Sequence, residues 1–330
     1  PEKSSVGLLN FLIYISFFPQ LVAGPIVRAR TFLPQLKAGY IKAVPNIHLA
    51  FSLIFGGLFK KLIISTYLQV HIVDLVLKSP STHSPIEILL AIYGFSAQIY
   101  CDFSGYSDIA IGTALLMGFK FPDNFDSPYR AVNIQDFWRR WHITLSTWLK
   151  DYLYIPLGGN RKGKFLTYIN LMITMLLGGL WHGASLTFIV WGGFHGIALV
   201  VNKIWTNIKH KYNLGFGNGK LIRGVSIFIT FHFVSFLWVF FYHKDFSSAL
   251  DVFSSLINFD VSLTEIDLYV IFAIFIGIGV HFFGDRIRNY YLSLMYSTNY
   301  MVHTVANAVL MILLINISPK TVPPFIYFQF

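Results

Sequence analysis

Apolar side chains run through the chain in long blocks that short polar segments separate. Four blocks contain no Asp, Glu, Lys or Arg: 165–177, 186–201, 225–242 and 268–283. Further apolar blocks cover 6–23 and 305–317. Blocks of this kind are typical of helices that cross a membrane, whereas the strands of a membrane barrel alternate apolar and polar positions. The pattern therefore predicts an all-α fold: a polytopic transmembrane helix bundle with short interfacial and re-entrant helices.

Two apolar blocks carry charges that cannot face lipid. Block 47–76 contains two glycines and the pair Lys60-Lys61, and we expect a helix that bends or re-enters, with the lysines snorkelling or facing the protein interior. Block 86–117 is too long for one straight span and contains the polar stretch 102–108. Because carboxylates are costly in hydrocarbon, this stretch is predicted to line a cavity or to mark a helix break.

Segment 134–149 differs from the spans because it is short and rich in tryptophan. At about 100° per residue, Phe137, Trp138, Trp141, Leu145 and Trp148 fall on one face of a helix. The pattern predicts one amphipathic helix that lies at the interface or dips into a cavity. A second interfacial helix is expected at 246–257.

Composition agrees with a membrane protein. The chain is 55% hydrophobic and only 12% charged, where soluble domains carry about 25% charged residues. The net charge of +10 indicates basic cytoplasmic loops and contact with the lipid bilayer, with no nucleic acid as partner. The single Cys101 excludes an internal disulfide and a cysteine-cluster metal site, and no metal is predicted. The chain begins with Pro1 rather than Met, so we expect N-terminal helices to be missing.

Basic loops predict the topology. Loops 151–164, 203–223 and 285–303 are basic and belong in the cytoplasm, while the acidic loop 243–267 belongs on the other side. The turn of the 165–201 hairpin, with His182, then points away from the cytoplasm. Its first arm, 165–180, reaches about 24 Å, short of a hydrocarbon core of about 30 Å. His182 is therefore expected at membrane depth.

Two histidines are the best catalytic candidates, His142 and His182. Histidine can take a proton from a hydroxyl near neutral pH, as acyl transfer requires. The alternative for His182 is a histidine at a helix end, bonded to a neighbouring carbonyl. We expect both imidazoles to open onto one pocket, within about 10 Å of each other. His195, in a Trp-Gly-Gly-Phe-His-Gly stretch one span later, is expected beside the same cavity.

At these residues the chain resembles the membrane-bound O-acyltransferase (MBOAT) family, and specifically its alginate O-acetyltransferase branch of the AlgI type. The central motifs are Phe137-Trp138-Arg139-Arg140-Trp141-His142 and Gly179-Leu180-Trp181-His182-Gly183-Ala184. Further matching stretches are 16–26, 102–108, 124–129, 145–146, 152–159 and 325–330. The resemblance implies one MBOAT-like membrane domain over 1–330.

The resemblance also assigns roles. It implies that His182 is the catalytic residue and that His142 is its polar partner in a substrate tunnel. The residues expected to line that tunnel are Trp138, Arg139, Trp141, Trp181, Asp102, Ser104, Asp108 and His195. No bound cofactor is implied. The acyl donor would be acetyl-CoA or an acyl-carrier thioester, whose phosphates could meet Arg161, Lys162 and Lys164, although ordinary positive-inside charge explains that loop equally well.

The implied function is transfer of an acyl group, most often acetyl, across or within the membrane for O-acetylation of an exported polysaccharide such as alginate. The implied partners are a periplasmic or extracellular acetyltransferase and the polysaccharide acceptor, and the implied location is the bacterial inner membrane, with several spans. Three alternatives remain open. They are transfer of D-alanine to a cell-envelope polymer, a transporter or channel without chemistry of its own, and a structural subunit that would tolerate His182→Ala.

Overall fold

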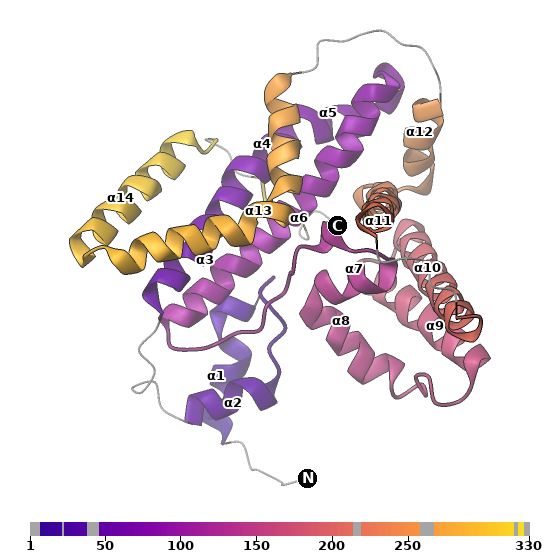
Figure 1. The fold of residues 1–330 in the computed structure, drawn as a ribbon, viewed down its shortest axis with the longest axis horizontal. Coiled ribbons are helices and arrows are strands. Elements are labelled where there is room, and N and C mark those ends of the chain that lie inside the picture. Colours follow the sequence, from indigo (N-terminus) through magenta and orange to yellow (C-terminus); the bar gives the residue numbers. More distant parts are fainter. Residues whose placement is uncertain are drawn as a thin grey trace.

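Every regular element of the computed structural model is a helix within the residues that it describes, 7–21, 23–37, 46–213, 219–257, 267–319 and 323–326 (Figure 1). The predicted all-α class is confirmed. The α-helices are α1 Leu8–Ser16, α2 Ala29–Lys37, α3 Ile47–Leu58, α4 Thr66–Leu68, α5 Asp74–Leu77, α6 Pro85–Leu116, α7 Ile134–Arg140, α8 Ile143–Leu149, α9 Lys164–His182, α10 Leu186–Lys211, α11 Lys220–Tyr242, α12 Phe246–Ile257, α13 Leu268–Ser297 and α14 Tyr300–Ile317.

Six helical stretches within the described ranges are long and apolar enough to cross a membrane. They are Ile47–Leu77, α6, α9, α10, α11 and α13. The predicted block 305–317 falls in α14, whose apolar part is shorter. The candidate span 6–23 is interrupted near Pro19, as its sequence predicts: α1 ends at Ser16, and a short 3₁₀ turn, Phe18–Gln20, follows. Residues 6 and 22 of that block lie outside the described residues. The chain is a multi-pass membrane protein.

Helix α6 is the central element, and of the two arrangements predicted for 102–108, a cavity lining or a helix break, the break does not form. The helix is continuous from Pro85 to Leu116 and starts with a capping box in which Ser84 and Glu87 bond each other's backbone N–H groups. It packs against α3, α11 and α13 (Figure 1). The carboxylates need no break, because Lys60 and Lys61 neutralise them from the neighbouring helical stretch.

The stretch that carries these lysines is one helical run with two π-helical segments, Phe59–Ser65 and Gln69–Val73. The lysine side chains are only 12% and 14% exposed, so they face the protein interior, as one of the two predicted arrangements requires. π-helical segments change which residues share a helix face. Here the first π-helical segment contains Lys60 and Lys61, and both of these consecutive lysines face α6.

Segment 134–149 forms two helices rather than the predicted one. Helix α7 ends at Arg140 and α8 begins at Ile143, so Trp141 and His142 lie at the break. The loop before α7 supplies the backbone hydrogen bonds there: Asp126 N–H donates to the Arg140 carbonyl, and Ile143 N–H donates to the Asn124 carbonyl, both at 2.9 Å. Tertiary contacts therefore override the amphipathic period. The predicted helix 246–257 is confirmed as α12.

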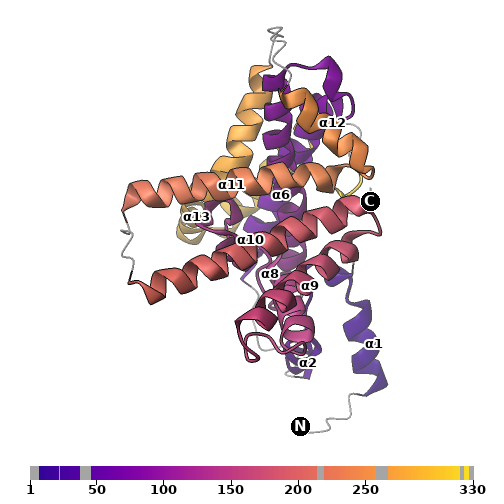
Figure 2. The ribbon, with the colours of Figure 1, turned by 90° about the vertical axis from the view of Figure 1, so that its right-hand side faces the viewer.

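Helices α9 and α10 pack closely through two glycines. A Cβ on Gly179 would lie 2.3 Å from the Phe188 carbonyl oxygen, and a Cβ on Gly192 would lie 2.4 Å from that of Met175. Small residues allow this approach of two membrane helices. Helix α11 lies beside α10, with the C-terminal end of α10 and the N-terminal end of α11 at one end of this pair and α12 near the other (Figure 2). His182, in the turn before α10, therefore lies at the end of the pair near α12.

Candidate active site

His142 occupies the break between α7 and α8 with a backbone conformation that few residues adopt. Its φ is +41° and its ψ is +55°, the left-handed region, and its side chain is buried. Its Nδ1 lies 3.1 Å from Oδ1 of Asn124, and its ring meets Phe103 edge-on at 4.7 Å. The loop 118–133 and helix α6 therefore hold the imidazole from two sides.

The hydrogen bonds of Asn124 determine the tautomer of His142. The backbone N–H of Thr144 can only donate, and it donates to Oδ1 of Asn124, as does the Thr144 hydroxyl at 2.8 Å. The Asn124 Nδ2 group donates to the Ser107 hydroxyl at 3.0 Å. Because Asn124 presents its oxygen to His142, Nδ1 of His142 carries the proton and Nε2 has the free lone pair.

Burial, followed by the neighbouring His182 imidazole, lowers the pKa of His142 to about 3. The ring is therefore neutral at neutral pH, and its Nε2 can accept a hydrogen bond or a proton. Protonation of both His142 and His182 would place two positive charges side by side in this desolvated setting, which would be costly.

His182 is the last residue of α9, as the sequence indicated. Its ring lies among aromatic side chains, with centroid distances of 5.0 Å to Trp181, 5.3 Å to Trp191 and 5.0 Å to Phe241. Trp181 is also edge-on to His142 at 6.4 Å. The structure therefore brings the two histidines together from different elements, with Trp181 in contact with both.

His195 lies deeper in the same aromatic cluster. It is fully buried, accepts a hydrogen bond at Nδ1 from the Trp138 indole at 3.3 Å, and contacts Trp191 at 4.8 Å. Trp191 thus touches both His182 and His195. Trp141 is buried against Trp238 and Phe137 instead, so it belongs to the packed core behind the break.

The three polar residues expected from α6 bond to lysines, and no bond to a histidine is seen for them within the described residues. Asp102 pairs with Lys61, and Asp108 pairs with Lys60 at 2.5 Å. Ser104 accepts from the same Lys60 ammonium at 2.9 Å. The residues of this stretch that reach the histidine site are Phe103, against the His142 ring, and Ser107, bonded to Asn124.

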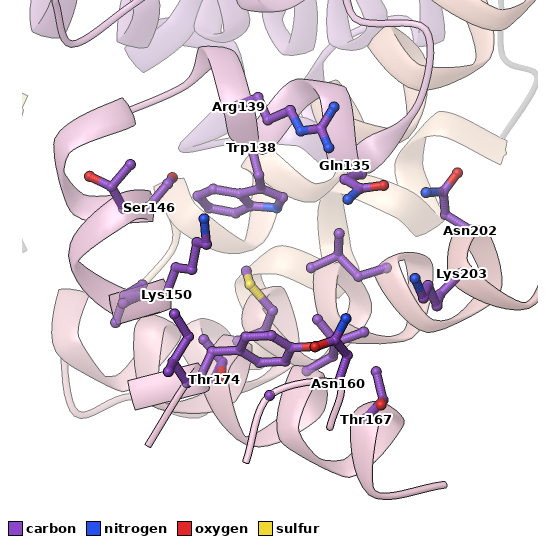
Figure 3. Close-up of a pocket in the computed structure, with 18 of the residues that line it drawn as sticks. Gln135, Trp138, Arg139, Ser146, Lys150, Asn160, Thr167, Thr174, Asn202 and Lys203 are labelled. Carbon is purple, nitrogen blue, oxygen red and sulfur yellow. The ribbon is translucent and has the colours of Figure 1, made fainter. Parts of the chain in front are cut away.

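A cavity of about 560 Å³ lies beneath the α7–α8 break, lined in part by Trp138 and Arg139 (Figure 3). It is basic: Arg139, Lys150, Arg161 and Lys203 line it, and no acidic residue does. Neither His142 nor His182 is among its lining residues. Lys162 and Lys164 do not line it either, and the Lys162 stem lies against Gly158.

Sequence reasoning missed the polar residues that hold the site together. The sequence places Asn124 and Ser107 only within the stretches 124–129 and 102–108, and it gives Thr144 no role. On the cavity wall, Lys203 is predicted only as part of the basic loop 203–223, and the sequence gives Lys150 no role. An asparagine in a polar loop directly before a segment with a candidate histidine is a usable signal, because a buried histidine needs a partner that fixes its tautomer.

The chain was compared with known proteins. Residues 2–243 match the membrane-bound O-acyltransferase family. A peptidoglycan O-acetyltransferase of Helicobacter pylori is 44% identical over 81% of this chain and 50% of that protein. A probable alginate O-acetylase AlgI of Pseudomonas putida is 35% identical over 98% of this chain and 69% of that protein. A teichoic acid D-alanyltransferase of Bacillus subtilis is 31% identical over 74% of this chain. The chain thus spans about half the length of the first of these relatives.

Proposed function

The chain belongs to the membrane-bound O-acyltransferase family, and from this premise we propose that it transfers an acetyl group to a hydroxyl of a cell-envelope polysaccharide. The observation that carries the proposal is the buried, neutral His142, with a defined tautomer, beside His182 at the α9–α10 turn. Two of the relatives carry names of this reaction class, a peptidoglycan O-acetyltransferase and a probable alginate O-acetylase, and this supports the proposal.

In the proposed step His182 takes the proton of the acceptor hydroxyl as its oxygen attacks the thioester carbonyl. The new C–O bond forms, the C–S bond breaks, and the proton passes from His182 to the departing sulfur. His142 has a free lone pair at Nε2 and no proton there, so it accepts a hydrogen bond rather than stabilising the oxyanion. It therefore orients the acceptor hydroxyl or the His182 ring, not the acyl carbonyl.

The acyl donor is proposed to occupy the basic cavity under the α7–α8 break. Four cationic side chains without an acidic neighbour in the lining suit a ligand with phosphates, such as acetyl-CoA or an acyl-carrier thioester. Its volume is in the range of about 300–1,000 Å³ typical of ligand sites. Trp138, on the cavity wall, bonds to His195 in the aromatic cluster around His182, so the cavity borders the histidine site.

The orientation follows from the loop charges. With the basic segments 151–164 and 203–223 in the cytoplasm of a bacterial inner membrane, the donor cavity opens to the cytoplasm and the His182 turn faces the other side. Much of segment 203–223 is helical, because α10 extends to Lys211 and α11 begins at Lys220. A donor from the cytoplasm and a polymer outside the cell then approach the histidines from opposite sides. An extracytoplasmic acetyltransferase partner fits this arrangement.

The test uses the full-length protein in proteoliposomes with radiolabelled acetyl-CoA outside and an oligosaccharide acceptor inside. We expect label on the acceptor, and a loss of about 10²–10⁴-fold in His182→Ala. His210→Ala, at the exposed end of α10, is the matched control and should keep full activity. Retention of activity within about twofold in His182→Ala would contradict the assignment.

Label that crosses the membrane without joining the acceptor would favour a transporter, and preference for a D-alanyl donor would favour the teichoic acid branch.

A further inference from the structure

A second cavity shares no lining residue with the donor cavity. It has a volume of about 250 Å³ and is lined by residues of α5, α6, the end of α11 and the segment 323–326. With the proposed orientation its lining residues Tyr242, His243 and Lys244 lie at the extracytoplasmic end of α11. The ends of α5 and α11 lie in the region of α12 (Figures 1 and 2).

The cavity holds polar atoms that lack partners among the residues that the structure describes. Gln98 is 2% exposed, lines the cavity, and its Oε1 accepts no hydrogen bond there. Nε2 of His243 is likewise buried without a partner in the described ranges. A buried acceptor without a hydrogen bond is costly, so a ligand in the cavity that donates to Gln98 Oε1 would be stabilised there.

The charged residues of the cavity indicate which charge a ligand would carry. Asp74 is its only acidic residue, and both of its oxygens are occupied, by the Tyr242 hydroxyl at 2.8 Å and by Lys78 at 2.9 Å. Lys244 is exposed and forms no ion pair within the described part of the chain. Lys244 is therefore the one cation of the lining without an ion pair in the described part of the chain, although Asp245 and Asp251 lie close enough to act electrostatically on His243. Beside it lie the Gln98 acceptor and the His243 Nε2 atom, each able to bond a hydroxyl.

We propose that this cavity binds one acidic sugar residue of the acceptor, with its carboxylate on Lys244 and its hydroxyls on Gln98 and His243. The volume is below the range of about 300–1,000 Å³ for larger ligands, which suits a single ring. The last turn of α11 connects the two sites, because Phe241 contacts His182 and the next residue, Tyr242, lines the cavity. The inference rests on the proposed function in naming a saccharide.

Binding is measured by calorimetry and saturation-transfer NMR on the full-length protein in detergent. The probes are a uronic-acid trisaccharide, a muramic-acid disaccharide, and the carboxyl-reduced form of the trisaccharide. At least one acidic probe should bind, and the reduced trisaccharide should bind about tenfold more weakly than its acidic form, because a charge-assisted hydrogen bond is lost. Lys244→Gln should remove this difference without changing the affinity for the reduced probe. Gln98→Met should weaken the binding of every probe.

Lys220→Gln, at the other end of α11, is the control and should bind like the wild type. Because Lys244 is exposed, its variant tests the site even where Gln98→Met folds poorly. No saturable binding of any acidic probe, or equal affinities in Lys244→Gln and wild type, would overturn the inference and leave a cavity filled by water. Transfer and binding measured on the same wild-type preparation separate the two proposals, because binding of an acidic probe without any transfer contradicts the proposed function alone. The His182→Ala variant should bind the probes like the wild type.

Discussion

Nδ1 of His142 lies 3.1 Å from Oδ1 of Asn124, at a residue whose φ is +41°. This contact has two consequences at the α7–α8 break. It fixes the tautomer of the His142 imidazole, and it ties a residue with a left-handed backbone conformation to the preceding loop. Since Asn124 also bonds Thr144 and Ser107, one amide links α6, the loop 118–133 and α8 at the candidate site.

His142→Asn should keep the fold and lose transfer. Asparagine tolerates a positive φ better than most residues, and its Nδ2 group can take the place of Nδ1–H toward Asn124. The variant lacks an atom at the Nε2 position, so we expect acyl transfer to fall about 10²-fold with little change in melting temperature. Transfer and thermal melting are measured on the same preparation.

The comparison variant is His142→Val, which lacks the donor and strains the backbone, because β-branched residues are rare at positive φ. It should melt at a lower temperature than His142→Asn. If His142→Asn keeps wild-type transfer, His142 serves only to build the break, and the paired-histidine mechanism fails while the family assignment stands.

Stability should depend on pH through His142. Its pKa is about 3 in the folded protein and about 6.5 in an unfolded chain, so the unfolded state binds the proton first as pH falls. The stabilisation is complete above about pH 6.5 and is lost as pH falls toward 3. Between pH 7 and pH 5 this one group should remove about 2 kcal/mol of unfolding free energy.

The measurement is unfolding in mixed micelles at pH 7 and pH 5, for the wild type and for His142→Asn. Burial also lowers the pKa of His243, to about 4, so the wild type has other pH-dependent contributions of the same sign. Only the difference between the two proteins belongs to His142. Identical pH dependence in both would mean that the imidazole is solvated rather than buried.

The sequence predicted the spans well and the polar contacts poorly, for physical reasons. Apolar blocks and the glycines before His182 are local signals, so the class, most spans and the helix end at His182 follow from the pattern. The break at Trp141-His142 depends on backbone bonds from the loop at Asn124, far outside any helical period. For the same reason Asp102 and Asp108 were placed near the histidines, although their lysine partners face them from another helix.

Asp102→Asn should destabilise the protein strongly. Asp102 pairs with Lys61 and accepts the Ile326 N–H at 2.7 Å, while Lys61 also bonds the Pro323 carbonyl at 3.3 Å. Removing one charge leaves the other buried, which costs about 3–5 kcal/mol. We expect this loss in unfolding measurements, together with faster proteolytic release of the segment 323–326.

Two further variants show whether the loss of stability in Asp102→Asn comes from the buried charge of Lys61. The double replacement Asp102→Leu with Lys61→Met should recover most of the stability, because an apolar pair removes both desolvated charges. Asp285→Asn, in the exposed pair with Arg288, should change stability by less than about 1 kcal/mol. Equal effects of Asp102→Asn and Asp285→Asn would show that the interior pair is hydrated.

Arg161→Gln and Lys203→Gln should weaken use of a phosphate-bearing acyl donor. Both side chains line the basic cavity under the α7–α8 break, where Lys203 lies beside Asn202 (Figure 3). If they hold donor phosphates, each substitution should raise the KM for acetyl-CoA about tenfold, because one charge-assisted hydrogen bond is lost, and leave kcat nearly unchanged. Higher ionic strength should reduce the difference from wild type, since salt screens exposed charges.

Two comparisons show whether the charges act on the phosphates. Lys162→Gln removes a charge from the same loop, but Lys162 does not line the cavity, so its KM should stay near the wild-type value. S-acetyl-pantetheine carries the same thioester without phosphates, and all three variants should use it like the wild type does. If the basic residues only reflect positive-inside charge, Lys162→Gln and Arg161→Gln should have the same KM for acetyl-CoA. The variants should then also rank in the same order with S-acetyl-pantetheine as with acetyl-CoA.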